Sequence, residues 1–243
     1  MHYYGSLRVS DYVTLKRYNN EIYKLTYYKT PIRQKGFEVG KKKRVRGVNS
    51  SKLENNISRA RNKVFEYAMC NDFQYFVTLT IDRKKYDRKD LGTYYKNFSQ
   101  FLRNYGRNHK TKVEYVLIPE KHKNGAWHMH GLVKGIPGKH LVKNEHGYLD
   151  WPHYRDRFGW ISLAPIRSTE RVSKYITKYI SKDLSRTVTD LNAKMYYSSK
   201  GLKVAEEIKR GTLCADSVPY DFENDYVKIK WFDDDSIANS ILD

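Results

Sequence analysis

The sequence lacks several features of secreted, membrane-spanning or nucleotide-hydrolysing proteins. Its 243 residues include two cysteines, Cys70 and Cys214, which lie far apart without metal-type spacing. We therefore expect reduced thiols in a reducing compartment. No run of about 18 apolar residues predicts a membrane span, and no charged segment followed by an apolar one predicts a secretory signal. Because no Gly-x-x-x-x-Gly-Lys-Ser/Thr occurs, the chain carries no P-loop NTPase motif. We expect a cytoplasmic protein.

Acidic residues are scarce: 27 Asp and Glu stand against 46 Lys and Arg, which gives a net charge of +19. Such an excess opposes folding through self-repulsion, and a polyanionic partner would relieve it. Residues 215–243 carry a net charge of −6, which leaves +25 for residues 1–214. This distribution favours a nucleic-acid-binding body whose acidic tail limits non-specific contact. A basic protein that is merely soluble or ribosome-associated fits the charge equally well.

Composition divides the chain into a basic N-terminal extension at 1–49, a central domain at 50–204 and an acidic C-terminal extension at 205–243. The hydrophobic fraction of 40% and the aromatic fraction of 14% predict a folded core rather than a disordered chain. The N-terminal extension ends in the basic run 40–46, which is either an arm that contacts phosphates or a solvated linker.

Apolar periodicity predicts the elements of the central domain. The predicted helices are one from about residue 51, one at 90–105 and one at 168–185, and the predicted strands are 73–81, 112–119, 126–134, 159–164 and 194–198. An Asn-Gly pair at 124–125 predicts a hairpin, and residues 135–157 an insertion or loop. This order predicts an α+β fold, with a central antiparallel sheet of about five strands in split βαβ order, ferredoxin-like or RRM-like. We expect helices on one face of the sheet, an extra N-terminal helix and a C-terminal extension, so that the other face is free to carry a site.

A His-x-His pair lies in the strand predicted at 126–134. Because alternate residues of a strand face the same side, His128 and His130 project together, while Trp127 and Met129 point to the opposite face. Two neighbouring imidazoles can clamp a metal ion. A pair of half-exposed structural histidines would produce the same pattern, so the pair needs a further ligand to indicate a site.

Glu120 is the candidate for that ligand. It ends the preceding strand, and the Asn-Gly hairpin folds this strand back beside the histidine strand. Glu120 would then complete a site of two histidines and one carboxylate with open positions. Such mixed ligation suits Mg²⁺ or Mn²⁺ when a phosphate supplies further oxygens. The alternatives are that Glu120 is a surface carboxylate, or that His122 in the turn is a ligand, although it is less well placed.

Two Tyr-x-x-Lys repeats lie in the helix predicted at 168–185. At 3.6 residues per turn, Tyr175 and Tyr179 lie between an apolar stripe and a cationic stripe that contains Lys178 and Lys182. A phenol there could reach a phosphate, with a lysine to help deprotonate it or to balance charge on the phosphorane. Among 22 tyrosines such spacing also arises by chance, so its combination with the histidine strand carries the weight.

Together these segments resemble the motifs of the HUH endonucleases, the rolling-circle replication initiators of phages, plasmids and single-stranded DNA viruses. The three motifs are FVTLT at 76–80, HMH at 128–130 and YITKYISK at 175–182, in this order. Glu120 matches a carboxylate ligand upstream of the histidine strand. The likeness covers about residues 70–200, and it is greatest to phage and plasmid replication-associated (Rep) proteins with two tyrosines a helical turn apart.

The resemblance implies a site-specific single-stranded DNA endonuclease and strand transferase. The implied metal ligands are His128, His130 and Glu120, and the implied catalytic residues are Tyr175, Tyr179, Lys178 and Lys182. A bound Mg²⁺ or Mn²⁺ would polarise the scissile phosphate. Tyrosine attack would leave a 5′-phosphotyrosyl link and a free 3′-OH that primes rolling-circle replication, and the strands would be rejoined at termination. The implied partners are single-stranded or hairpin origin DNA and the helicase and DNA polymerase of a bacterial host cell.

Two alternatives stay open. A relaxase-like or transposase-like nickase would use the same chemistry in another process. A non-catalytic basic module would bind single-stranded nucleic acid by stacking bases on tyrosines. A covalent, metal-dependent DNA adduct distinguishes the enzymes from the binding module.

Overall fold

The structure of the protein is a computed structural model. It describes residues 8–19, 22–33, 50–145, 147–187, 194–213 and 218–233. The chain divides into two compact units, one of residues 48–203 and one in which residues 1–47 join residues 204–243. Within the described residues, no helix has both the length and the apolar character that crossing a bilayer requires. The basic run at 40–46 lies outside the described residues.

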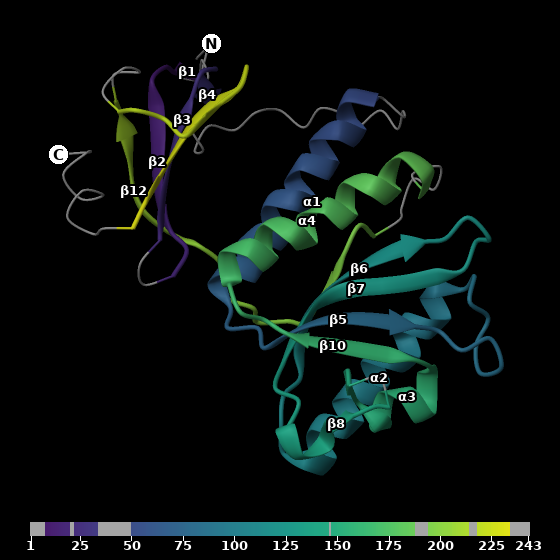
Figure 1. The fold of residues 1–243 in the computed structure, drawn as a ribbon. Coiled ribbons are helices and arrows are strands. Elements are labelled where there is room, and N and C mark those ends of the chain that lie inside the picture. The colour runs from purple at the N-terminus through teal and green to yellow at the C-terminus, as the bar shows by residue number, and fades with distance from the viewer. Residues whose placement is uncertain are drawn as a thin grey trace, which may run out of the picture. The chain divides into compact units, whose positions relative to one another are not determined.

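An antiparallel sheet of seven strands, in the order β11-β6-β7-β5-β10-β9-β8, forms the centre of the larger unit (Figure 1). The strands are β5 (Tyr75–Thr80), β6 (Glu114–Lys121), β7 (Trp127–Lys134), β8 (Val142–Lys143), β9 (Leu149–Asp150), β10 (Ile161–Pro165) and β11 (Tyr197–Ser198). Because β5 lies between β7 and β10, the sheet has the split order that the sequence predicted, and the α+β class is confirmed. The strands β8, β9 and β11 have two residues each, and they bring the total above the expected five.

Helices pack on both faces of this sheet, whereas the sequence predicted helices on one face. α1 (Ser50–Cys70) and α4 (Thr169–Thr187) cover one face, and α2 (Leu91–His109) and α3 (Pro152–Phe158) cover the other (Figure 1). The reason lies in the strands, whose successive side chains point to opposite faces. Val116 and Ile118 of β6 pack in the core beneath α1 and α4, while Leu117 between them packs in the core beneath α2 and α3. A sheet that is apolar on both faces needs cover on both.

Residues 135–157, which the sequence predicted to be a loop, contain regular elements that complete the core. They form the 3-10 helix η1 (Gly138–His140), β8, β9 and most of α3. Trp151, Tyr154 and Phe158 are buried at the helical spacing i, i+3 and i+7. Charged residues separate them within about two turns, so the periodicity was too short to be recognised.

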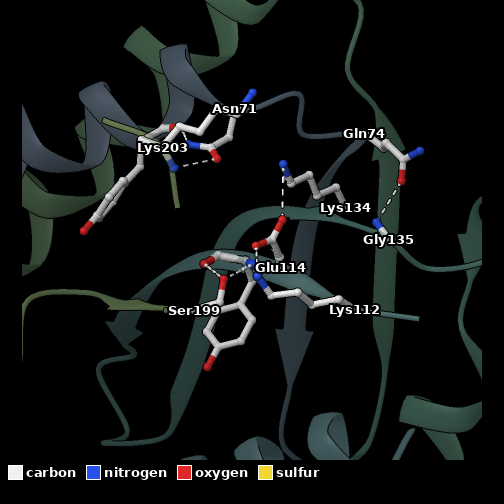
Figure 2. Close-up of polar contacts among 10 residues, drawn as sticks. Asn71, Gln74, Lys112, Glu114, Lys134, Gly135, Ser199 and Lys203 are labelled. Carbon is white, nitrogen blue, oxygen red and sulfur yellow. Dashed lines mark hydrogen bonds and ion pairs between the residues drawn. The ribbon is translucent and has the colours of Figure 1, made fainter. Parts of the chain in front are cut away.

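Polar contacts fix the last segment of the larger unit to the rest of it (Figure 2). The backbone N–H of Tyr115 donates to Ser199 Oγ over 2.9 Å. The Asn71 amide donates to the carbonyl of Lys203 over 3.0 Å and accepts from the Lys203 N–H over 3.1 Å. Asn71 is buried, so its two bonds tie the end of α1 to the chain that leaves β11.

A second set of polar contacts lies at the start of β6 (Figure 2). Glu114 pairs in register with Lys134 of β7 and forms ion pairs with Lys112 over 2.6 Å and with Lys134 over 3.3 Å. Close by, the Gly135 N–H donates to the Gln74 side chain over 3.0 Å. These contacts stabilise the register of β6 against β7 at the end opposite to Glu120.

The smaller unit is built from both ends of the chain, which the sequence treated as separate extensions. Its five-stranded antiparallel sheet has the order β12-β2-β3-β14-β13. The strands are β2 (Tyr12–Arg17), β3 (Tyr23–Tyr28), β12 (Glu206–Thr212), β13 (Phe222–Glu223) and β14 (Val227–Phe232), and β1 (Arg8–Val9) pairs separately with β4 (Ile32–Arg33). Leu15 and Leu25 lie in its small core. The division into three segments at residues 49 and 204 stays a prediction.

Candidate functional site

Strand pairing brings the two histidines of β7 over two threonines of β5. His128 lies opposite Thr80 and His130 lies opposite Thr78. Nδ1 of His130 is 3.2 Å from Thr78 Oγ1, and Nδ1 of His128 is 3.4 Å from Thr80 Oγ1. Both histidines face the side of α4, while Met129 is fully buried on the other side, as alternation predicted. Sequence reasoning found the threonine strand but not these bonds. Its signal was two Thr two residues apart, matching two His two residues apart.

Glu120 of β6 contacts one of the two histidines directly. Its backbone lies opposite His128, yet its carboxylate Oε2 reaches diagonally to His130 Nε2 over 2.7 Å. The ring of His128 packs instead on His122, with ring centroids 4.0 Å apart. The structure therefore brings Glu120 and His130 together, and it places His122, the alternative ligand, beside His128.

The helix α4 presents its two tyrosines to His130. Ile176 and Ile180 are buried and hold the helix on the sheet. The next stripe around the helix therefore lies at the edge of the contact. Tyr179 stacks on the ring of His130, with centroids 4.3 Å apart and an interplanar angle of 19°. Tyr175 is 46% exposed, and the two phenol oxygens are 2.9 Å apart.

Phe76 of β5 completes an aromatic cluster with these side chains. Its ring centroid lies 5.5 Å from that of Tyr175, 6.2 Å from that of Tyr179 and 6.3 Å from that of His130. Such aromatic contacts hold ring orientations more tightly than aliphatic packing does. Phe76 therefore sets the approach of α4 to the histidine strand.

The two predicted lysines differ in what the structure describes. The Nζ of Lys178 lies 6.0 Å from the ring centroid of Tyr175, and the residue is exposed. Lys182 belongs to α4, but its side chain lies outside the described part of the structure.

Burial sets the protonation of this cluster. It lowers the pKa of His128 to about 4, with help from the positive charge that His122, His130 and Arg88 can carry. Burial also lowers the pKa of His130, although Glu120 opposes this effect. Both imidazoles are neutral at pH 7, the form that ligates metal ions.

The phenol of Tyr179 is protonated at neutral pH. Burial raises its pKa, and the hydrogen bond to Tyr175 and the negative charge of Glu120 raise it further. A positive charge beside this phenol would oppose these effects and favour its ionised form.

A basic and aromatic cavity of about 680 Å³ lies between α1, α2 and the β11 segment. It shares no lining residue with the His-Tyr cluster. Its lining includes three cations and three tyrosines, which are Arg59, Lys63, Lys194, Tyr95, Tyr196 and Tyr197. Cations and exposed aromatic rings are the groups that contact phosphates and bases of single-stranded nucleic acid.

The fold and the cluster define a class: an α+β protein with imidazole, carboxylate and phenol groups gathered on one face of an antiparallel sheet. Residues 74–184 match the family model of the replication-associated protein ORF2. This segment is similar to that family, and it contains every residue of the predicted site. The match supports a role in the initiation of replication and an interaction with DNA. No curated protein and no solved structure matches the chain.

Proposed function

We propose that the protein is a replication initiator that nicks one strand of origin DNA by tyrosine attack. The observation that carries the proposal is the stacking of Tyr179 on His130, whose Nε2 bonds Glu120. A nucleophile, a base-type ligand and a carboxylate thus lie in one contact chain. The match of residues 74–184 to replication-associated proteins supports the same conclusion.

The donor set fits a divalent cation such as Mg²⁺ or Mn²⁺. His128, His130 and Glu120 would hold it, because both imidazoles are neutral and the Glu120 side chain is 32% exposed. The Nδ1 atoms of both rings adjoin threonine hydroxyls, which leaves both Nε2 atoms for ligation. Hydrogen bonds of this kind orient a ligating ring. The bound ion would polarise the scissile phosphate and neutralise charge that develops on it.

The chain's own part in the reaction is the nucleophile. In the proposed step a phenol loses its proton, its Oη forms a bond to phosphorus, and the P–O3′ bond breaks. The departing O3′ takes a proton and becomes the 3′-OH that primes synthesis, while the 5′-phosphate stays on the tyrosine. Attack by that or another 3′-OH reverses the step and rejoins a strand. No nucleotide hydrolysis is needed, so unwinding and synthesis fall to a helicase and a polymerase of the host.

The two tyrosines have different surroundings, and we propose Tyr179 as the first nucleophile. Its ring contacts His130, and its phenol feels the charge of Glu120, so it adjoins the metal-ligand set. Tyr175 is the more exposed phenol and bonds Tyr179 through its oxygen. It is placed to relay the proton and to attack in a second strand transfer. Lys178 and Lys182 would balance the negative charge of the phosphorane.

The test is a covalent adduct. Protein is incubated with Mn²⁺ or Mg²⁺ and 5′- and 3′-labelled single-stranded DNA of its own replicon, then run on a denaturing gel. We expect an adduct that carries the label 3′ of the nick and disappears with EDTA. Tyr179→Phe should lose most of the adduct, Tyr175→Phe less, and the double variant all of it. Tyr148→Phe, which alters an exposed phenol of the same unit, is the matched control.

A non-catalytic binding module is the second candidate, favoured by the cavity between α1, α2 and β11. That function predicts a shift on native gels with no adduct under any metal condition. It also predicts that Arg59→Ala and Lys194→Ala weaken binding while the double tyrosine variant binds normally. Such a result would remove the nickase, together with its relaxase-like and transposase-like forms.

A further inference from the structure

Three histidines gather on the opposite face of the sheet from His128 and His130. His109 is the last residue of α2, His140 ends η1, and His153 lies in the first turn of α3. One possible ligand atom of each lies within 4.8 Å of those of the other two. Across the described residues, this is the group of three such side chains that comes this close. None of the three belongs to the motifs that point to DNA cleavage.

Tyr105, one turn before His109, lies beneath all three rings. Its ring centroid is 4.4 Å from that of His109, 5.3 Å from that of His153 and 5.7 Å from that of His140. Its hydroxyl hydrogen-bonds Nδ1 of His140. Tyr105 is buried, while His109 and His153 are exposed and His140 is half-buried. A fixed phenol below and open solvent above is the surrounding of a ligand group at a surface.

We propose that His109, His140 and His153 form a second metal site, which binds a zinc ion. Imidazole nitrogen is a preferred ligand of zinc, and three histidines with a solvent-facing fourth position is a known zinc arrangement. Mg²⁺ and Ca²⁺ prefer oxygen ligands and would bind here weakly. In a tetrahedral site the nitrogens lie about 2.0–2.1 Å from the ion, so the rings must approach one another slightly. Two of them are exposed at helix ends, where a side chain rotates with little cost.

The bond between Tyr105 and His140 supports the proposal. Metal-ligating histidines almost always use their second ring nitrogen in a hydrogen bond that fixes the ring. Here Nδ1 of His140 has that partner, which leaves Nε2 as its ligand atom. A cluster that served aromatic packing alone would not need three imidazoles, and any positive charge on them would be repulsive.

The site would join three segments that are distant in sequence. His109 and His153 are 44 positions apart, and the chain between them includes β6, β7 and η1. A metal held by ligands from α2, η1 and α3 restrains the segment at 136–158 on the helix, because binding to the folded state alone stabilises it. The proposal does not rest on the nicking function, and it survives if no adduct forms.

The test measures zinc in the full chain with the strand site disabled. In a His128→Ala/His130→Ala background, we expect about one zinc ion per chain after dialysis at pH 7.5, read by mass spectrometry of metals. Adding His109→Ala and His153→Ala should remove it, while adding Asn108→Ala, an exposed neighbour on α2, should retain it. Circular dichroism of each variant distinguishes loss of the ligands from loss of the fold. Co²⁺ in place of zinc should give the intense visible bands of a tetrahedral site.

Tyr105→Phe keeps the ring and removes the hydroxyl. We expect it to weaken zinc binding by about 10- to 100-fold, the usual effect of losing an outer partner. Zinc that stays bound after His109 and His153 are replaced would overturn the proposal. So would a background variant that is folded by circular dichroism yet retains no zinc.

Discussion

The two histidine groups of the larger unit differ in what holds them together. His128 and His130 are two residues apart on one strand, so the pleat alone points them to the same side. His109, His140 and His153 come from three elements and meet only when α2, η1 and α3 pack. A strand-borne pair is written into local sequence, whereas a packed triple is a property of the tertiary fold. Substitutions should therefore separate the two groups cleanly.

The largest effect is expected from the strand pair. His128→Ala combined with His130→Ala should lower adduct formation by more than about 100-fold, which is the upper range for losing an outer partner of a ligand. The adduct yield at saturating Mn²⁺ is the measurement, and Asn108→Ala is the control. An adduct at the wild-type level in the double variant would show that the imidazoles do not serve nicking.

Thr78→Val should come next. It keeps the shape of the side chain but removes the hydroxyl that lies 3.2 Å from His130 Nδ1. We expect about 10- to 100-fold weaker Mn²⁺ activation, measured as the Mn²⁺ concentration that gives half-maximal adduct. Thr78→Ser restores a hydroxyl and should recover most of the loss. Equal activation curves for the Val and Ser variants would mean that Thr78 does not orient His130.

Gly131→Ala tests the strand register itself. A Cβ at Gly131 would lie 2.2 Å from the Val116 carbonyl oxygen and 2.5 Å from a Leu117 methyl carbon. Overpacking of this kind costs about 1–3 kcal/mol, measured by urea unfolding. Gly138→Ala is the matched control in η1, because a Cβ there meets no atom within 4 Å. If both variants unfold alike, the close approach of β6 and β7 at Gly131 is wrong.

The smallest effect is expected from Glu114→Gln, at the far end of the same strand pair. Burial alone would raise the pKa of Glu114, but hydrogen bonds and ion pairs with Lys112 and Lys134 outweigh it and lower the pKa below 4.5. The carboxylate therefore stabilises the folded state at pH values above its unfolded pKa, and this contribution is lost as the pH falls through its folded pKa. We expect a loss of about 0.2–1 kcal/mol at pH 7 that fades in acid. The exposed Glu54→Gln is the control, and a difference that grows in acid would contradict the assignment.

The sequence predicted the parts of the fold that rest on local patterns. The strand at 126–134, its hairpin and the inward and outward alternation of His128 and Met129 follow from period-two spacing and an Asn-Gly turn. The border position of Tyr175 and Tyr179 follows from 3.6 residues per turn. In the structure Tyr175 is exposed, Tyr179 is half-buried, and both adjoin buried Ile176.

The sequence could not predict what depends on packing between distant segments. Glu120 was expected near both histidines, but its bond to His130 and the contact of His128 with His122 depend on side-chain rotamers. The sheet that both chain ends form in the smaller unit joins strands about 190 residues apart in sequence, as the pair of Arg17 with Glu206 shows. The triple of His109, His140 and His153 required α3, whose two turns gave too short a pattern.

The most direct measurement is the location of DNA on the protein. Trypsin cuts after Lys174, Lys178 and Lys182, so that Tyr175 and Tyr179 fall in separate four-residue peptides, YITK and YISK. Mass spectrometry of the nuclease-trimmed adduct should find the 5′-linked nucleotide on YISK, with a smaller share on YITK. A nucleotide on a peptide from outside α4, or a metal-dependent cleavage that leaves no protein-linked nucleotide, would contradict the account.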